Sequence, residues 1–179
     1  TLDGALLQFL KRVDPKEKNF VVLHVMGSHI EYRNRYPKEF QKFNDGKINQ
    51  EADFDNTVLY TDWVLSQIYD YARDNLNLDA MIYFSDHGSD PDVALRIPMF
   101  CYLSEGYQKR NPDVVKAIKA NKDKYFTNDL EYEFICGVLN MESPNYDPTM
   151  SIASSKWSME RKDLKTRFGK TSLMEDMEY

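Results

Sequence analysis

The sequence has few of the side chains that most often carry metal or acid–base chemistry, with three histidines and two cysteines among 179 residues. Two cysteines exclude a disulfide-rich scaffold and a cysteine-rich zinc module. Cys101 and Cys136 both lie within apolar runs, and we expect them to be free, buried thiols. Any metal or acid–base chemistry must therefore use His24, His29 or His87, or depend on carboxylates.

Positive charge and long apolar runs are lacking as well. Acidic residues outnumber basic ones by 29 to 23, which gives a net charge of -6. Nucleic acid is therefore excluded as the main partner, because phosphate binding requires a basic surface. No run reaches the roughly 18 apolar residues that a membrane-spanning helix needs. The chain starts at Thr1 without a signal peptide, and we expect it to be a piece of a longer protein.

The residues that are present suffice for one domain with a real core, since 42% are hydrophobic and 29% are charged. Apolar residues recur at helical spacing in four stretches, and the strongest of these patterns predicts a long helix in the first half of the chain. Asn128 is placed to cap the last of the four helices. The expected helices cover residues 2–13, 51–76, 114–120 and 129–139.

Three short apolar runs between these helices predict buried strands, which cover residues 20–26, 80–85 and 97–103. The first run is rich in β-branched residues and indicates a parallel strand. The alternation of helix and strand predicts an α/β fold with a largely parallel sheet. Residues 143–179 are polar with scattered Trp and Met, and we expect an extended tail that wraps a surface.

Two of the predicted strands end in residues that could carry chemistry. In open α/β sheets, ligands bind beyond the carboxyl ends of the strands. His24 lies in the first run and His29 follows it, while Asp86 and His87 directly follow the second run. A carboxylate beside an imidazole can supply two ligands to a zinc-class ion. Two ligands do not make a zinc site, which normally takes three or four protein groups.

Each of these candidates also has a plainer interpretation. Asp86 and His87 with the following glycine are the ingredients of an ordinary turn, which is the commoner identity of such a tripeptide. His24 sits inside an apolar run, where a hydrogen-bonded core histidine is the commoner role. His29, in a polar loop, is equally well explained as functional or simply exposed. Thr57 is discounted as a nucleophile, because it lies within the helical pattern and no neighbouring base is evident.

Four separated blocks nevertheless resemble one family in the right order. They are VLHVMGSH (22–29) with YRNRYPKEFQKF (32–43), FDNTVLYTDWVLS (54–66), YFSDHG (83–88) and RIPMF (96–100). The chain resembles the lipid A phosphoethanolamine transferases, of the alkaline phosphatase and sulfatase superfamily, over most of its length. This resemblance implies a three-layer alkaline-phosphatase-like sandwich with a mostly parallel sheet, of which residues 1–179 would form an incomplete, later portion.

The resemblance also implies an activity and a place in the cell. Such enzymes are anchored in the inner membrane, and their catalytic domain faces the periplasm or the cell exterior. They transfer phosphoethanolamine from phosphatidylethanolamine to lipid A or another glycan acceptor through a covalent phospho-threonine. The resemblance implies zinc, or another divalent cation, as the cofactor that activates this threonine.

Site residues follow from the matching positions. Asp86 and His87 match zinc ligands of the family, and His29 matches a histidine near the substrate phosphate or a second zinc. His24 matches the strand histidine before it, with a structural or supporting role behind the ligands. The nucleophilic threonine, its acidic neighbour and the membrane anchor match no residue of this chain, so residues 1–179 alone are expected to be inactive.

The chain departs from the family pattern at two places. The family has a longer loop after Asp-His-Gly that carries a further histidine, whereas here residues 89–95 lead almost directly into Arg96. Ile30 and Glu31 follow His29 where the family has Gly-Pro. A phosphoglycerol transferase, a phosphodiesterase, a sulfatase and a non-catalytic binding module remain as alternatives. Neither cysteine has the C/S-x-P-x-R context that a sulfatase needs.

Overall fold

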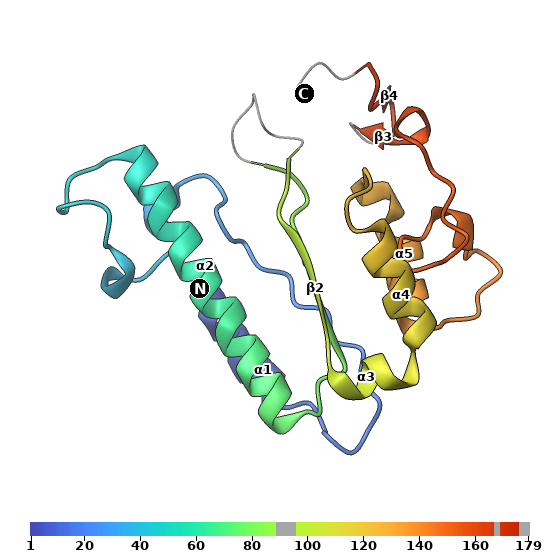
Figure 1. Cartoon of the computed structure of the whole chain (residues 1–179). Helices are drawn as coiled ribbons and strands as arrows, with labels where there is room; N and C mark the ends of the chain where they lie inside the picture. Colours follow the sequence, from blue (N-terminus) through green and yellow to red (C-terminus); the bar gives the residue numbers. More distant parts are fainter. Residues whose placement is uncertain (89–95, 167–168, 176–179) are drawn as a thin grey trace. The chain divides into compact units, whose positions relative to one another are not determined.

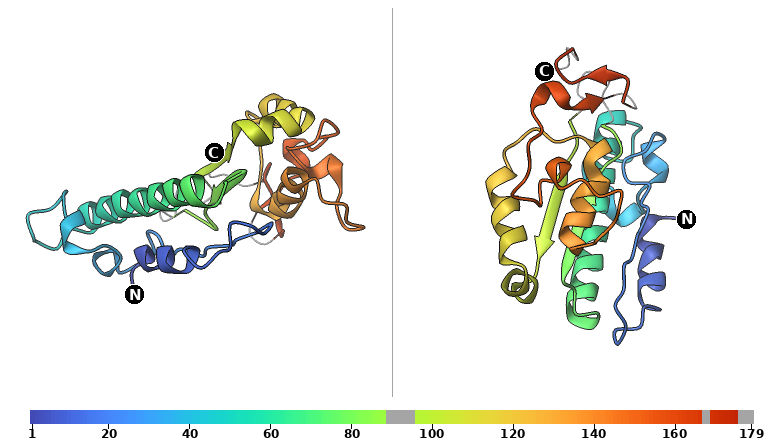
Figure 2. Two further views of the ribbon diagram at one scale, coloured as in Figure 1. Left: turned by 90° about the horizontal axis from the view of Figure 1, so that it is seen from below. Right: turned by 90° about the vertical axis from the view of Figure 1, so that its right-hand side faces the viewer.

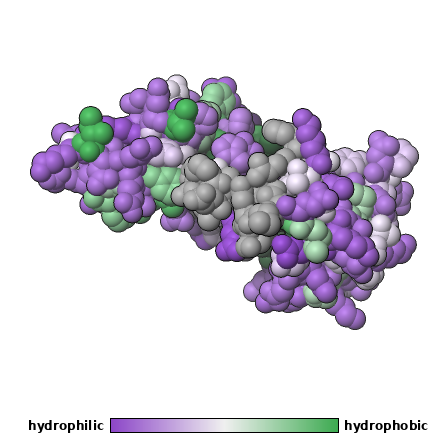
Figure 3. Space-filling view, turned by 90° about the horizontal axis from the view of Figure 1, so that it is seen from above, coloured by the Kyte–Doolittle hydropathy of each residue, from purple (hydrophilic) through white to green (hydrophobic). Residues whose placement is uncertain are grey.

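The computed structural model describes residues 1–88, 96–166 and 169–175. The chain divides into two compact units, Thr1–Leu78 and Asp79–Tyr179, and each is described by itself. Among the described residues, no helix has both the length and the apolar character needed to cross a bilayer. Hydrophobic residues are scattered among hydrophilic ones on the face drawn in Figure 3.

The first unit is built around the long helix α2 (Gln50–Asn75), which the sequence predicted to within one residue at each end. Its start is fixed by the Asn49 side chain, which accepts a hydrogen bond from the Ala52 N–H at 3.2 Å. The expected helix over residues 2–13 is shorter, with a 3-10 turn (Asp3–Leu6) leading into α1 (Leu7–Leu10). Helix α1 lies against α2 (Figure 1).

Aromatic side chains join the N-terminal segment and a short 3-10 helix (Lys38–Phe40) to α2. The rings of Phe40 and Tyr60 meet edge to face at a centroid distance of 5.0 Å, and Trp63 stacks on Tyr60 at 5.8 Å. The Tyr60 hydroxyl accepts a hydrogen bond from the Gly4 N–H at 3.0 Å. These contacts bury one face of α2 although little of the surrounding chain is regular.

Buried polar side chains of α2 hold the loop before it, which includes a 3-10 helix (Tyr32–Asn34). Asp53 and Asn56 are 3% and 0% exposed. Asp53 accepts a hydrogen bond from the Tyr36 hydroxyl at 2.5 Å, and Asn56 accepts from the backbone N–H groups of Lys42 and Phe43 at 2.7 and 3.1 Å. Buried polar groups need such partners, so α2 determines the path of an otherwise irregular loop.

The predicted strand over residues 20–26 is wrong. The segment forms neither a helix nor a strand, and Phe20 and Val22 are 64% and 76% exposed. A buried parallel strand needs a hydrogen-bonded neighbour along its length, and no described residue of the first unit supplies one. Apolar, β-branched composition alone therefore did not make this run a strand.

The second unit contains two adjacent strands, β1 (Ala80–Phe84) and β2 (Met99–Leu103). They pair antiparallel, with Ala80 opposite Leu103 and Phe84 opposite Met99. The strand positions match the sequence-based prediction, but the parallel direction does not. Both pairs of strands in the described part of the chain, including β3 (Lys165–Thr166) with β4 (Thr171–Ser172), are antiparallel. A helix between strands gives a parallel pair only when it joins two strands of one sheet, and α2 is not preceded by a strand here.

Three helices cover one face of the β1–β2 pair: α3 (Glu105–Arg110), α4 (Pro112–Asn121) and α5 (Glu131–Leu139). Figure 2 shows α4 and α5 running side by side across β2. Their core residues Val115 and Phe134 pack with Ile82 and Cys101, which point to this face of the strands. This layer confirms an α/β arrangement within the unit.

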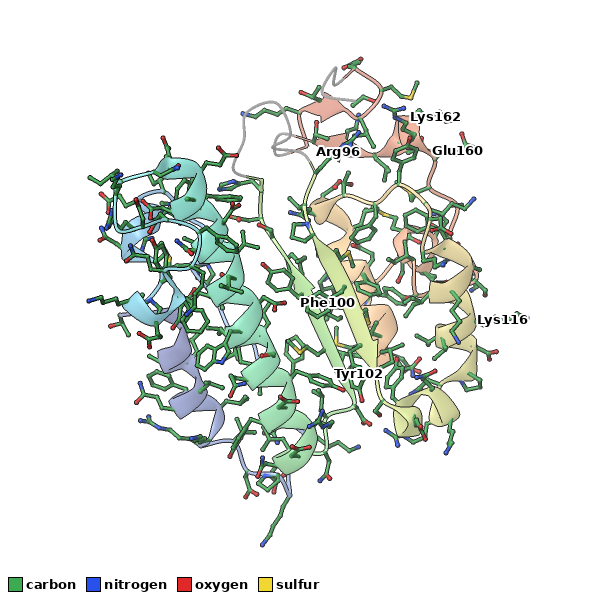
Figure 4. All side chains as sticks on the ribbon, turned by 60° about the vertical axis from the view of Figure 1, so that its left-hand side comes forward. Arg96, Phe100, Tyr102, Lys116, Glu160 and Lys162 are labelled. Carbon is green, nitrogen blue, oxygen red and sulfur yellow. The ribbon has the colours of Figure 1, made fainter. Side chains whose placement is uncertain are left out.

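The opposite face of the two strands is aromatic and half-exposed. Phe100 and Tyr102 project from β2 on the side away from α4, on which Lys116 is labelled (Figure 4). Tyr83 of β1 stacks on Phe100 at a centroid distance of 5.2 Å. The apolar residues on both faces explain why the sequence predicted fully buried strands. Cys136 is buried and Cys101 is half-buried, and both thiols are free, as predicted.

The segment from residue 143 onward contains buried side chains despite its polar composition. Leu164 and Leu173 are each 1% exposed and join Leu130 in a small cluster. Two 3-10 turns, Pro148–Met150 and Arg161–Asp163, shape the segment. In the second turn, Lys162 forms an ion pair with the preceding Glu160 at 2.7 Å, and Figure 4 marks both residues.

Close packing between α5 and this segment predicts a cost for a single added methyl group. A Cβ atom at Gly137 would lie 2.6 Å from Ser151 Oγ and 2.8 Å from Ala153 Cβ. Gly137→Ala should lower the free energy of unfolding by about 1–3 kcal/mol. At Gly106 in α3 the nearest atom is the mobile end of Arg110, 3.1 Å away. Gly106→Ala should therefore be neutral or stabilising, and chemical denaturation that ranks the two variants the other way would contradict this packing.

Glu131 predicts a pH dependence of stability. The residue is buried, neither carboxyl oxygen has a hydrogen-bond partner among the described residues, and burial raises its pKa to about 7. The folded state thus binds the proton more tightly than the unfolded state, so stability is greatest below about pH 4.5 and falls until about pH 7. Glu131→Gln should remove this slope and be more stable at pH 8 by roughly 2–3 kcal/mol.

Denaturant titrations between pH 5 and pH 8 would measure this slope. Glu105→Gln is the matched control, because the Glu105 side chain is 91% exposed and should leave the slope unchanged. An equal slope in the wild type and in Glu131→Gln would show that Glu131 is not the group responsible.

Candidate functional site

The second unit places Asp86 and His87 in a tight turn directly after β1. The strand pairing ends at Phe84, and the turn beyond it is closed by its own side chains. The Ser85 hydroxyl donates to the His87 carbonyl at 2.8 Å, and the His87 N–H donates to Asp86 Oδ1 at 3.0 Å. The turn therefore fixes both side chains on one exposed corner of the unit.

One nitrogen of the His87 ring is hydrogen-bonded, and the other is available to a metal ion. Its Nδ1 lies 2.6 Å from the Gly88 carbonyl oxygen, which accepts a hydrogen bond when Nδ1 carries the proton. That tautomer leaves a lone pair on Nε2, which lies 3.8 Å from Asp86 Oδ2. The side chains of His87 and Asp86 are 65% and 87% exposed, so an ion could approach both donor atoms from solvent. A hydrogen-bonded imidazole with a free Nε2 is the form in which histidine binds metals.

Asn128 holds this turn from a distant part of the sequence. Its side-chain amide donates to the Ser85 carbonyl at 2.9 Å and to the Asp86 carbonyl at 3.0 Å. The prediction that Asn128 caps the last helix is wrong, because α5 is preceded by a 3-10 turn (Asn128–Leu130) and its N-cap is Leu130. An Asn before a helix has the composition of a cap, and nothing in the local sequence indicates contacts 42 residues away.

Asp86 and His87 fit a zinc-class ion by donor type. A carboxylate oxygen and an imidazole nitrogen are both common zinc ligands, but the ion takes four ligands in all. No group of three or more His, Cys, Asp or Glu side chains lies together in the described part of the chain. The two residues thus have the donor types for two of the four ligands of such a site, and the shortened loop at residues 89–95 lies outside the described residues.

The first unit places His29 after a turn that is anchored by the N-terminal segment. The Asp3 carboxylate accepts hydrogen bonds from the N–H groups of Met26 and Gly27 at 3.1 and 2.9 Å. Gly27 has a φ of +53°, a conformation that costs glycine little. The chain then turns back with the His29 N–H donating to the Met26 carbonyl at 3.3 Å, and the His29 side chain is exposed.

Thr57 lies beneath this turn and is fully buried. Its hydroxyl hydrogen-bonds to Ser28 Oγ at 2.7 Å and to the Phe54 carbonyl at 2.6 Å. A nucleophile must reach its substrate, and a hydroxyl with 0% exposure that is shared with the helix backbone does not. The structure thus supports the rejection of Thr57 as a nucleophile, and it shows a different role in which Thr57 ties the turn at Ser28 to α2.

His24 is exposed, which corrects the expectation of a hydrogen-bonded core histidine. The cause is the one that also prevents a strand here. Residues 20–26 have no strand partner in the described part of the chain, and most of their side chains are exposed. His24 and His29 belong to the first unit, and Asp86 and His87 to the second. Within the second unit the structure brings Asp86 and His87 together. It also shows contacts of Asp3 and Asn128 that the sequence did not indicate.

Curated relatives of the chain are phosphoethanolamine transferases. Phosphoethanolamine transferase EptA of Escherichia coli O157:H7 is 27% identical over 74% of this chain and 30% of its own length. Phosphoethanolamine transferase EptC of Escherichia coli K12 is 27% identical over 90% of this chain and 32% of its own length. The chain therefore spans about a third of the length of these relatives.

Solved structures share the fold. The C-terminal periplasmic domain of EptC from Campylobacter jejuni matches with a TM-score of 0.70 and 25% identity, over 88% of this chain and 59% of that one. The corresponding Escherichia coli domain, in a complex with Zn, matches with a TM-score of 0.75 and 24% identity, over 90% and 53% of the two chains. The sulfatase family model matches residues 1–133, and the chain belongs to the sulfatase family.

Proposed function

We propose that this chain forms part of the catalytic domain of a zinc-dependent phosphoethanolamine transferase. The donor would be phosphatidylethanolamine and the acceptor lipid A or another glycan, with a covalent phospho-threonine between the two half-reactions. The nucleophile of this reaction is placed outside residues 1–179. The complete domain would be a three-layer alkaline-phosphatase-like sandwich that is anchored in the inner membrane and faces the periplasm.

The observation that carries the proposal is the geometry of the turn after β1. Asp86 Oδ2 and His87 Nε2 lie 3.8 Å apart on exposed side chains. The other ring nitrogen, Nδ1, is already hydrogen-bonded to the Gly88 carbonyl oxygen. Two atoms bound to one tetrahedral zinc ion at about 2.0–2.1 Å would stand about 3.3 Å apart, so a small movement brings both to one ion. The similarity to an EptC domain that was solved with Zn supports the same choice of metal.

The chemistry of the proposal divides between the metal and this chain's own residues. Bound zinc would lower the pKa of the attacking hydroxyl and offset the charge that develops on the phosphoryl oxygens. Asp86 and His87 would hold the ion, and His29 would contact the substrate phosphate or a second zinc. His24 would have a structural or supporting role. A neutral or charged imidazole at His29 can donate a hydrogen bond to a phosphoryl oxygen.

Replacing His87 tests the metal assignment. In the full-length protein, His87→Ala should weaken zinc binding by more than about 100-fold and abolish transfer, because it removes a direct ligand. Isothermal titration with zinc measures the affinity, and mass spectrometry of the acceptor measures the transfer. His87→Ala protein that binds zinc like the wild type would refute the ligand assignment.

His29→Ala separates substrate binding from metal binding. His29 follows the turn at Gly27 and is not part of the turn after β1 that carries Asp86 and His87. The variant should therefore retain the zinc held by Asp86 and His87, and its main effect should be a raised KM. An equal loss of zinc affinity in His29→Ala and His87→Ala would contradict this division of roles.

Thr57→Val tests whether the nucleophile lies elsewhere. Valine has nearly the shape of threonine but lacks the hydroxyl that bonds to Ser28, so the free energy of unfolding should fall by about 1 kcal/mol. Transfer should persist, because Thr57 is not exposed to substrate. Thr57→Ser is the matched control that keeps the hydroxyl. Loss of transfer in Thr57→Val with full transfer in Thr57→Ser would make Thr57 the nucleophile after all.

A further inference from the structure

We infer that Asn128 is the positioning residue for the Asp86–His87 turn, and that the metal affinity of the site depends on its side-chain amide. The inference rests on the proposed function, since it concerns the same pair of ligands. It assigns to Asn128 a role that the sequence did not indicate, because its position before α5 is typical of an ordinary helix cap.

Among the described residues, the backbone of the turn has no strand partner beyond Phe84. The β1–β2 ladder ends at Phe84, so the carbonyls of Ser85 and Asp86 lie beyond the last strand partner. One amide group, Asn128 Nδ2, reaches both carbonyls at 2.9 and 3.0 Å. A primary amide has two N–H donors, so each carbonyl can receive one hydrogen bond of good length.

These two hydrogen bonds also orient the side chains of Asp86 and His87. The Asp86 carbonyl belongs to the peptide group that joins Asp86 to His87, so its direction sets how the two side chains are displayed. Without an external donor, that peptide could rotate and carry both metal-binding atoms to other positions. The Ser85 hydroxyl and the His87 N–H already use their bonds within the turn, and Asn128 supplies the link to the rest of the unit.

Asn128 belongs to a turn that is itself held firmly. It opens the 3-10 turn whose Leu130 is 1% exposed, and α5 continues from there with Phe134, also 1% exposed. The Leu130 N–H donates to the Thr127 carbonyl at 3.0 Å, which closes this turn around Asn128. Asn128 is itself half-buried, but the turn that carries it is anchored in the core by Leu130. Such a side chain can impose its geometry on an exposed turn, as supporting residues of metal ligands do.

The chain offers a matched control for this contact. Asn121, in α4, uses the same atom in the same way: its Nδ2 donates to the carbonyls of Ile152 and Ser154 at 3.1 and 3.2 Å. Asn121→Ala therefore removes the same kind of double hydrogen bond from the same unit, but at a different loop. Any general loss of stability is common to both substitutions, whereas an effect on the metal is expected of Asn128 alone.

Zinc competition with a chromogenic chelator, on the full-length protein, tests the inference without relying on activity. Asn128→Ala should bind zinc about 10–100-fold more weakly than the wild type, and Asn121→Ala should bind it equally well. Asn128→Asp keeps the size of the side chain but cannot donate, so it should weaken binding at least as much. The visible spectrum of the Co²⁺-substituted protein should change in both Asn128 variants and not in Asn121→Ala.

Each outcome is decisive. Folded Asn128→Ala or Asn128→Asp protein with wild-type zinc affinity would overturn the inference and leave the proposed function standing. Equal weakening in Asn121→Ala would also overturn it, since the effect would then be one of general stability. If the wild type binds no zinc, the proposed function fails, and the inference fails with it. If His87→Ala abolishes binding and the Asn128 variants weaken it, both are supported.

Discussion

The need of backbone carbonyls for hydrogen-bond donors is the constraint on which the candidate site depends. Where β1 stops pairing with β2, the chain keeps its polar groups but loses its neighbour. The amide of Asn128 takes the neighbour's place for two consecutive carbonyls. The exposed pair of potential ligands, Asp86 and His87, is therefore only as well ordered as the 3-10 turn (Asn128–Leu130) before α5, which carries the amide.

The first unit follows the same rule with a different set of side chains. Its long loop before α2 and its turn at Gly27 contain little regular structure, so buried polar groups supply what strands would otherwise supply. Asp53 and Asn56 secure the loop from α2, and Asp3 secures the turn from the N-terminal segment. In both units, a carboxylate or amide on a helix or 3-10 turn fixes the backbone that displays a histidine.

Much of this arrangement was predictable from the sequence, and the failures share one cause. Helix α2 and the strands β1 and β2 were predicted closely, because their patterns are local and strong. The position of Asp86 and His87 directly after β1 was predicted as well, whereas their role as metal ligands stays a prediction. Residues 20–26 failed as a strand, and Asn128 was mistaken for a cap, because strand pairing and long-range hydrogen bonds depend on partners that no local pattern specifies.

The central claim is that Asp86 and His87 together bind a metal ion. Anomalous X-ray scattering at the zinc edge, from crystals of the full-length protein, tests it most directly. The account predicts a zinc peak at about 2.0–2.2 Å from both His87 Nε2 and an Asp86 carboxylate oxygen. A zinc-soaked crystal with no anomalous peak at this turn, or with the peak on other residues alone, would contradict it.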